Sequence, residues 1–223
     1  MSGESAPKLP MFIALLTALG LAACVAGGSA EAPANVNLAG TWKLDPQHST
    51  DSRKALADLT KTARKETDRE RARANAPPFG GFPGGANSDA ALLQQPRMVF
   101  GPDLSLQRNL LASGDWVKIE QRPDEFVISN GETSRSYVPG ERSVVSVPGG
   151  VADQRSGWKS GGYWINLKPQ VGPSATETFK LSPDGKQLIE TIDIGRDGRI
   201  PAVKVTRVYV PTQEPPSALP SED

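Results

Sequence analysis

The sequence is poor in the residue types that form disulfides and metal centres. Its 223 residues include one cysteine, Cys24, and one histidine, His48. A single cysteine cannot form a disulfide within the chain, and so few nitrogen and sulfur ligands argue against a structural zinc site. We therefore predict no metal centre and no cofactor.

The chain also has no net charge. Lysine and arginine together number 25, and aspartate and glutamate together also number 25. A balanced chain creates no overall field that would attract nucleic acid or a strongly acidic substrate. We therefore predict no nucleic-acid partner. The length fits one domain with a substantial core better than two large domains.

The uncharged apolar run at residues 11–23 is shorter than the roughly 20 residues with which a helix crosses a bilayer. It ends in Leu21-Ala22-Ala23-Cys24, which resembles the lipobox of bacterial lipoprotein precursors. The resemblance implies that residues 1–23 are a cleaved signal peptide and that acylated Cys24 attaches the chain to a membrane. Val25, where inner-membrane lipoproteins often carry aspartate, favours an outer-membrane protein facing the periplasm over an inner-membrane or cell-surface one.

From Asp115 onward, short alternating runs separated by turn residues indicate antiparallel β-structure. Asn130-Gly131 is the strongest of these turn signatures, because this dipeptide favours a two-residue hairpin. With a first strand at residues 38–44, the chain offers nine or ten strands, enough to close a small barrel or form a strongly curved sheet. The other expected strands are residues 116–121, 126–129, 134–138, 143–147, 155–159, 163–167, 176–181, 187–194 and 202–210.

The first strand contains Gly40-Thr41-Trp42, which resembles the Gly-x-Trp that opens the first strand of lipocalins and related small barrels of the calycin type. The continuation through Leu44, Asp45 and Ser49 is similar to uncharacterised proteobacterial envelope proteins. The predicted fold class is therefore mainly β: an antiparallel meander that closes into a lipocalin-like barrel or a strongly curved sheet, with a helical insertion after the first strand.

The expected organisation is a flexible tether at residues 24–36, a β-domain at 37–211 and a disordered tail at 212–223. Residues 46–114 form the insertion. It should hold a helix with Ala55, Leu56, Leu59 and Ala63 on its apolar face, a proline- and glycine-rich loop at 76–87, and a second helix capped by Asp103. Residues 65–73 are basic and predicted as a solvated helix; contact with anionic head groups or another envelope protein is the alternative.

Arg207 is the unusual residue of the last strand. Alternation places it on the same face as Val203, Val205 and Tyr209, which is the side expected to be buried. The lipocalin resemblance implies that such an arginine packs across the tryptophan of the opening motif, here Trp42, and closes the barrel. Glu190, on the apolar face of the preceding strand, is the competing partner.

No set of residues predicts catalysis. Ser156 and Lys159 fit the Ser-x-x-Lys motif of penicillin-recognising enzymes, but they lie between predicted strands and not at the start of a helix. His48 follows Asp45 and precedes Ser49, which favours a turn with capping side chains over a catalytic triad. We predict no catalytic residue.

The aromatic residues Trp158, Tyr163 and Trp164 form the candidate binding surface. Strand alternation sends Tyr163 and Trp164 to opposite faces, so one of them belongs in the core. The other could line a cavity, stack on a sugar ring or lie at a membrane interface, and ordinary partial burial is the alternative.

These observations favour a non-catalytic, lipid-anchored periplasmic module for binding or interaction, and the lipocalin resemblance implies a small apolar or amphipathic ligand. The alternative is a structural or regulatory protein whose filled barrel acts through contacts with another envelope protein. An enzyme with an unrecognised site ranks last, because no acid, base and nucleophile occur at a known spacing.

Overall fold

The computed structural model describes residues 28–74, 103–112, 114–131, 133–195 and 201–213. The predicted signal peptide, Cys24, the loop at 76–87 and most of the predicted tail lie outside the described residues.

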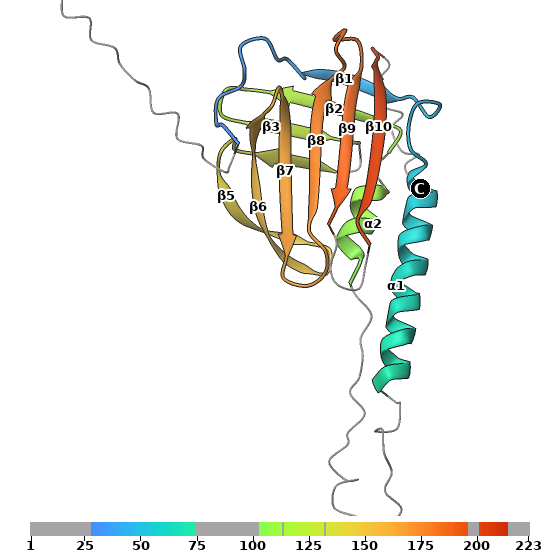
Figure 1. The fold of residues 1–223 in the computed structure, drawn as a ribbon. Coiled ribbons are helices and arrows are strands. Elements are labelled where there is room, and N and C mark those ends of the chain that lie inside the picture. The colour runs from blue at the N-terminus through green and yellow to red at the C-terminus, as the bar shows by residue number, and fades with distance from the viewer. Residues whose placement is uncertain (1–27, 75–102, 113, 132, 196–200, 214–223) are drawn as a thin grey trace, which may run out of the picture.

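Ten antiparallel strands form one sheet in the order β4-β3-β2-β1-β10-β9-β8-β7-β6-β5 (Figure 1). Strands that follow one another in sequence pair with one another, except β4 and β5, and the first strand also pairs with the last. The predicted mainly β, antiparallel meander is thereby confirmed. The strands are β1 (Gly40–Leu44), β2 (Trp116–Gln121), β3 (Phe126–Ser129), β4 (Ser134–Tyr137), β5 (Arg142–Val147), β6 (Gly150–Lys159), β7 (Gly162–Pro169), β8 (Ala175–Leu181), β9 (Leu188–Ile194) and β10 (Val203–Pro211).

The sheet is strongly curled. Phe126 of β3 stacks on Tyr163 of β7 with ring centroids 3.8 Å apart, although these strands are far apart in the order of the sheet. Arg135 of β4 likewise reaches Glu177 of β8, with 2.7 Å between Nη1 and Oε2. The sheet therefore encloses an interior like a barrel wall, and it has one seam, between the edge strands β4 and β5.

Strand alternation decides which side chains enter that interior. In β10, Val205, Arg207 and Tyr209 are fully buried while Thr206 is half-buried. This is the face that the sequence predicts to be buried.

Helix α1 (Ser52–Ala74) follows β1 in the chain and contacts β10. The backbone N–H of Asp45 donates to the carbonyl of Val208, and that of Thr50 donates to the carbonyl of Thr206. The chain thus follows the edge of β10 before the helix begins. Asp51 then caps the helix, because its carboxylate accepts the N–H of Lys54 at 3.0 Å.

Helix α2 (Ser105–Leu111) covers one end of the barrel (Figure 1). The Asp103 carboxylate accepts the N–H of Ser105 at 2.8 Å, but Leu104 holds the N-cap position and makes no side-chain capping hydrogen bond, which corrects the predicted Asp103 cap. The helix buries Leu106, Gln107, Leu110 and Leu111. Neither helix in the described part of the chain is long and apolar enough to cross a membrane.

The described part of the predicted tether, residues 28–36, contacts the barrel near both of its ends, although most of its residues are exposed. Ser29 and Trp158 exchange two backbone hydrogen bonds of 2.8 and 2.9 Å. Further along, the side-chain amide of Gln121 donates to the carbonyl of Val36 and accepts the N–H of Leu38. The pairing arises because β5 reaches only as far as Arg155 of β6, which leaves the edge of β6 at Trp158 for the N-terminal segment.

Candidate functional site

Two buried ion pairs occupy the interior of the barrel. Arg207 of β10 faces Glu190 of β9, and Arg135 of β4 faces Glu177 of β8. The two carboxylates and Arg207 are almost completely buried, whereas 31% of the Arg135 side chain is exposed. Two positive and two negative groups balance, so the interior has no uncompensated charge to attract an ionic ligand.

Arg207 is fully hydrogen-bonded by the protein itself. Its guanidinium donates to Ser52 Oγ at the start of α1, to both Glu190 oxygens, and to the carbonyls of Leu110 and Leu111 at the end of α2. Those carbonyls belong to the last turn of α2, and a cation at a helix C-terminus is favourable. Arg207 therefore joins both helices to the sheet.

Burial shifts the ionisation of this cluster. Burial raises the pKa of the Glu190 carboxyl. Arg207 opposes this shift, whereas the nearby Glu177 carboxylate raises the pKa of Glu190 further. Burial and the neighbouring Glu190 also hold the pKa of Tyr209 well above its ordinary value. The Tyr209 hydroxyl donates to Glu190 Oε2 at 2.7 Å, so this oxygen accepts hydrogen bonds from both Arg207 and Tyr209.

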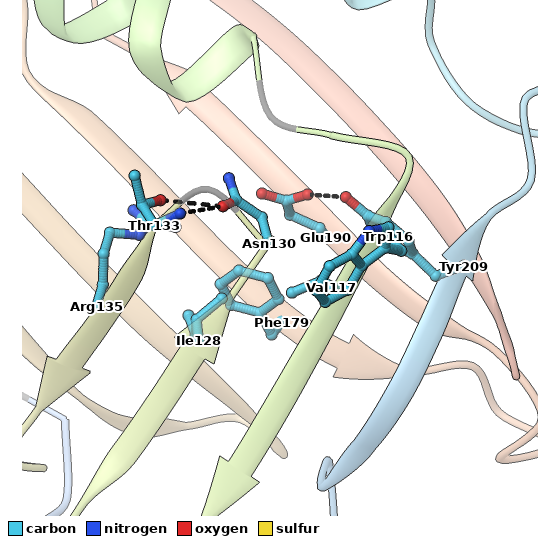
Figure 2. Close-up of a pocket in the computed structure, with 9 residues that line it drawn as sticks. All are labelled: Trp116, Val117, Ile128, Asn130, Thr133, Arg135, Phe179, Glu190 and Tyr209. Carbon is cyan, nitrogen blue, oxygen red and sulfur yellow. Dashed lines mark hydrogen bonds between the residues drawn. The ribbon is translucent and has the colours of Figure 1, made fainter. Parts of the chain in front are cut away.

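The space left inside this cluster is small. Figure 2 shows Asn130 and Glu190 on one side of it, Phe179 and Ile128 on the other, and Arg135 at the end near Thr133. Its volume is about 20 Å³, which accommodates about one water molecule. Within the described residues, large side chains thus fill the space around this cluster, and this cavity does not accommodate an alkyl chain.

A larger cavity of about 260 Å³ lies at the seam, and we call it the seam pocket. Buried apolar side chains from α2, β4 and β7 line it, and polar side chains lie among its other residues. Arg135 lines both the seam pocket and the small interior cavity. The lining consists of Leu106, Asn109, Leu110, Arg135, Ser136, Tyr137, Val145, Ser146, Val147, Pro148, Gln154 and Leu167.

Arg135 forms an ion pair with Glu177. Its guanidinium makes two bonds to Glu177, of 2.7 and 3.1 Å, and lies 6.0 Å from the ring centroid of Tyr137. Burial alone would lower the pKa of Arg135, but the Glu177 carboxylate raises it above its ordinary value. A guanidinium has five N–H donors, so Arg135 can still donate to a ligand.

The predicted aromatic surface is divided between two faces. Trp158 and Tyr163 lie inside, where their rings meet nearly edge to face at 5.1 Å. Trp164 lies on the outer face beside Gly28, and its buried indole N–H has no hydrogen-bond partner in the described part of the chain. Tyr163 donates to Ser156 Oγ, and burial raises the pKa of Tyr163 to about 12. None of the three aromatic residues lines the seam pocket.

The structure does not bring Trp42 and Arg207 together. Trp42 pairs with Pro211, and its indole N–H donates to the carbonyl of Leu38 at 3.1 Å. Arg207 pairs with Glu190, the competing partner named from the sequence. The first and last strands are joined by backbone pairing instead of by a cation over an aromatic ring.

The remaining predicted positions form no active site. Ser156 is buried and Lys159 is exposed, because residues three apart in a strand point to opposite faces. His48 Nδ1 lies 2.6 Å from Asp45 Oδ2 on the turn before α1. Within the described residues, no three histidine, cysteine or acidic side chains are placed to hold a metal ion.

Arg135 and Glu177 are the interior residues that the sequence reasoning missed. Both occupy inward positions of their strands, since Arg135 shares a face with Tyr137 and Glu177 shares a face with Phe179. A charged residue at a position where the alternation of the strand expects an apolar one would have indicated each of them.

No protein-family model and no curated protein matches the chain. Among solved structures, the chain is similar to Caenorhabditis elegans lipid binding protein 8, with 16% identity, a TM-score of 0.43, and 80% of this chain and 100% of that chain covered. It is also similar to secretory abundant heat soluble protein 4 from Ramazzottius varieornatus, with 14% identity, a TM-score of 0.41, and 78% of this chain and 94% of that chain covered. A third similar structure is the fatty acid-binding protein of Drosophila melanogaster brain, with 14% identity, a TM-score of 0.39, and 78% of this chain and 99% of that chain covered. Likeness at this level assigns neither a ligand nor an activity to the chain.

Proposed function

We propose that the protein is a non-catalytic binding module that holds an apolar or amphipathic ligand in the seam pocket. We further propose that acylated Cys24 attaches it to the outer membrane, where it faces the periplasm. The observation that carries the binding proposal is the seam pocket itself, a cavity of about 260 Å³ beside a barrel interior that is already filled. The lipobox carries the proposed location.

The lining of the seam pocket defines the chemistry of its ligand. Leu106, Leu110 and Leu167 provide a buried apolar wall for an alkyl or aromatic group. Gln154 and Arg135 offer hydrogen-bond donors to a polar end. The volume lies just below the roughly 300 to 1,000 Å³ of typical ligand sites. We therefore expect a short chain or a small ring system, not a whole phospholipid.

The same lining supports a binding role over catalysis. Ser136 is one of its hydroxyl groups, and this hydroxyl donates to Glu125 at 2.6 Å, on an exposed part of the wall. The carboxylate nearest to Arg135 is Glu177, which both guanidinium bonds hold in place. The lining residues contain no histidine, cysteine or carboxylate that could serve as a general base.

The proposal is tested with the purified full chain and the fluorescent probe anilinonaphthalene sulfonate, which has an aromatic body and one anionic group. Val147→Trp places a large ring in the seam pocket, and Val144→Trp places the same ring on an exposed position of the same strand outside it. We expect Val147→Trp to weaken probe binding by at least about tenfold, and Val144→Trp to leave it nearly unchanged. Thermal unfolding verifies that both variants remain folded.

The second candidate function is that of a structural or regulatory envelope protein with a filled barrel. The observation in its favour is the interior cavity of only about 20 Å³. If the wild-type chain does not bind the probe, or if the two tryptophan variants bind it equally well, the seam pocket is not a ligand site. The filled-barrel function would then take its place.

A further inference from the structure

A groove of about 270 Å³ between α1 and α2 contains an unusual concentration of arginine, and we call it the arginine groove. Arg108 of α2 and Leu104, just before the helix, line the groove. Three other residues of α2, Leu106, Asn109 and Leu110, line the seam pocket. The lining consists of Thr60, Ala63, Arg64, Thr67, Asp68, Arg71, Leu104 and Arg108.

The floor of the arginine groove is built by the packing of the two helices. Ala63 and Thr67 of α1 and the neighbouring Leu104 are buried. Ala63 and Leu104 belong to one apolar cluster that also contains Leu59 and Leu111. A floor of this kind excludes water from one side of the groove, so it strengthens electrostatic interactions above it.

The lining of the groove carries three arginines and one acidic residue, so its net charge is positive. Arg64 and Arg71 lie two helical turns apart on one face of α1, about 10 Å from each other, and Arg108 faces them from α2. The acid in the lining is Asp68, which reaches Arg71 only at 3.9 Å. Asp103 is also near, because Arg108 contributes to the lowered pKa of its carboxyl. Within the described residues, neither Arg64 nor Arg108 forms an ion pair.

We propose that the arginine groove binds a compact anionic phosphate group. A guanidinium donates two parallel hydrogen bonds to phosphate oxygens, and arginine is the preferred residue for such recognition. Arg64 and Arg108, the two arginines of the groove without an ion pair, supply two positive charges, enough for the single charge of a phosphodiester head group or the roughly two charges of free phosphate near neutral pH. The phosphate group can belong to free phosphate or to a lipid head group, and the site is independent of the seam pocket.

The first test titrates inorganic phosphate into the full chain in detergent micelles at low ionic strength, with calorimetric detection. Arg64→Gln combined with Arg108→Gln removes two positive charges from the groove. Arg53→Gln combined with Arg155→Gln removes the same charge from exposed positions outside it. We expect the groove variant to lose at least about tenfold in phosphate affinity and the control to lose less than about twofold. Thermal unfolding verifies both folds, and Arg108→Gln alone should give an intermediate loss.

The second test distinguishes the sources of the phosphate group. The same variants are floated with vesicles of phosphatidylglycerol or of phosphatidylcholine, since a lipid anchor inserts into both. Stronger flotation with phosphatidylglycerol that only the groove variant loses identifies a lipid head group. Equal flotation together with phosphate binding identifies free phosphate. If the wild type neither binds phosphate nor prefers phosphatidylglycerol, or if the control loses as much as the groove variant, the proposal is overturned.

Discussion

Arg207 and Glu190 occupy directly paired positions of β10 and β9 and face each other inside the barrel, with 3.2 Å between Nη1 and Oε2. The same guanidinium binds Ser52 and the final carbonyls of α2. One side chain thereby contacts both the start of α1, which follows β1, and the end of α2, which covers the barrel end. The seam pocket and the arginine groove both depend on α2, so both depend on this arrangement.

Replacing Arg207 should therefore destabilise the domain strongly. In Arg207→Met, Glu190 keeps its burial but loses its cation, and a broken buried pair costs about 3 to 5 kcal/mol of unfolding free energy. Adding Glu190→Gln should recover part of that loss, because the uncompensated carboxylate is then removed. Urea unfolding of the single and double variants measures the coupling. A double variant whose loss equals the sum of the single losses would contradict the structural role of the pair.

Trp42→Leu with Arg207→Met is the matched control for this coupling. Trp42 pairs with Pro211 and not with Arg207, so the two losses should add within about 0.5 kcal/mol.

Strand positions were predictable from the sequence because each strand alternates and ends at turn residues. The inward face of β10 followed from the same alternation. The partner of Arg207 could not be predicted in the same way. Trp42 and Glu190 were both candidates, and only the register of β10 against β9 and β1 decides between them. The contact between the N-terminal segment and β6 could not be predicted for another reason. Ser29 and Trp158 bind each other through backbone atoms, and backbone hydrogen bonds require no particular residue types.

The seam pocket could not be predicted at all. It exists because β4 and β5, although consecutive, do not pair with one another. Alternation shows which residues of a strand point inward, but it does not show which neighbouring strands separate. The Arg135 and Glu177 pair was predictable only in part. Alternation indicates that each side chain points inward, but their contact across the barrel depends on how the sheet curls.

The N-terminal segment should be released by a substitution in β6. A Cβ at Gly157 would lie 2.9 Å from the carbonyl oxygen of Ser29 and 3.2 Å from the amide nitrogen of Gly140. Gly157→Ala should therefore separate the segment from Trp158, at a cost of about 1 to 3 kcal/mol. Hydrogen exchange of the Ser29 and Trp158 amides measures this release directly.

Gly114→Ala is the control for that experiment. A Cβ at Gly114 meets only the carbonyl oxygen of Asn130, at an ordinary 3.6 Å. Protection of the Ser29 amide should be unchanged in this variant. If Gly157→Ala leaves the Ser29 amide equally protected, the observed pairing of the segment with β6 is wrong.

The proposed anchor gives a direct prediction for Cys24. Wild-type protein should incorporate labelled fatty acid and partition with membranes, whereas Cys24→Ala should do neither, because the thiol carries the lipid. His48→Ala serves as a control substitution, since this residue lies on an exposed turn. Fatty-acid labelling that persists in Cys24→Ala would exclude this residue as the anchor.

The three tyrosines of the chain should resist ionisation until the domain unfolds. Burial raises the pKa of Tyr137, Tyr163 and Tyr209, and that of Tyr163 from 10.0 to about 12. Because each folded-state pKa lies above the unfolded value, the resulting stability is fully present below pH 10 and is lost as the pH rises through about 12. For Tyr163 the loss amounts to about 3 kcal/mol.

The measurement follows tyrosinate absorbance and circular dichroism together as the pH is raised. We expect both signals to change in one transition, and tyrosinate to form near pH 10 only when urea is present. Tyr163→Phe removes one of the buried ionisations, so its loss of stability between pH 8 and the transition should be smaller than that of the wild type. A tyrosine that ionises near pH 10 while the circular dichroism is still native would show that its side chain is not buried as the structure places it.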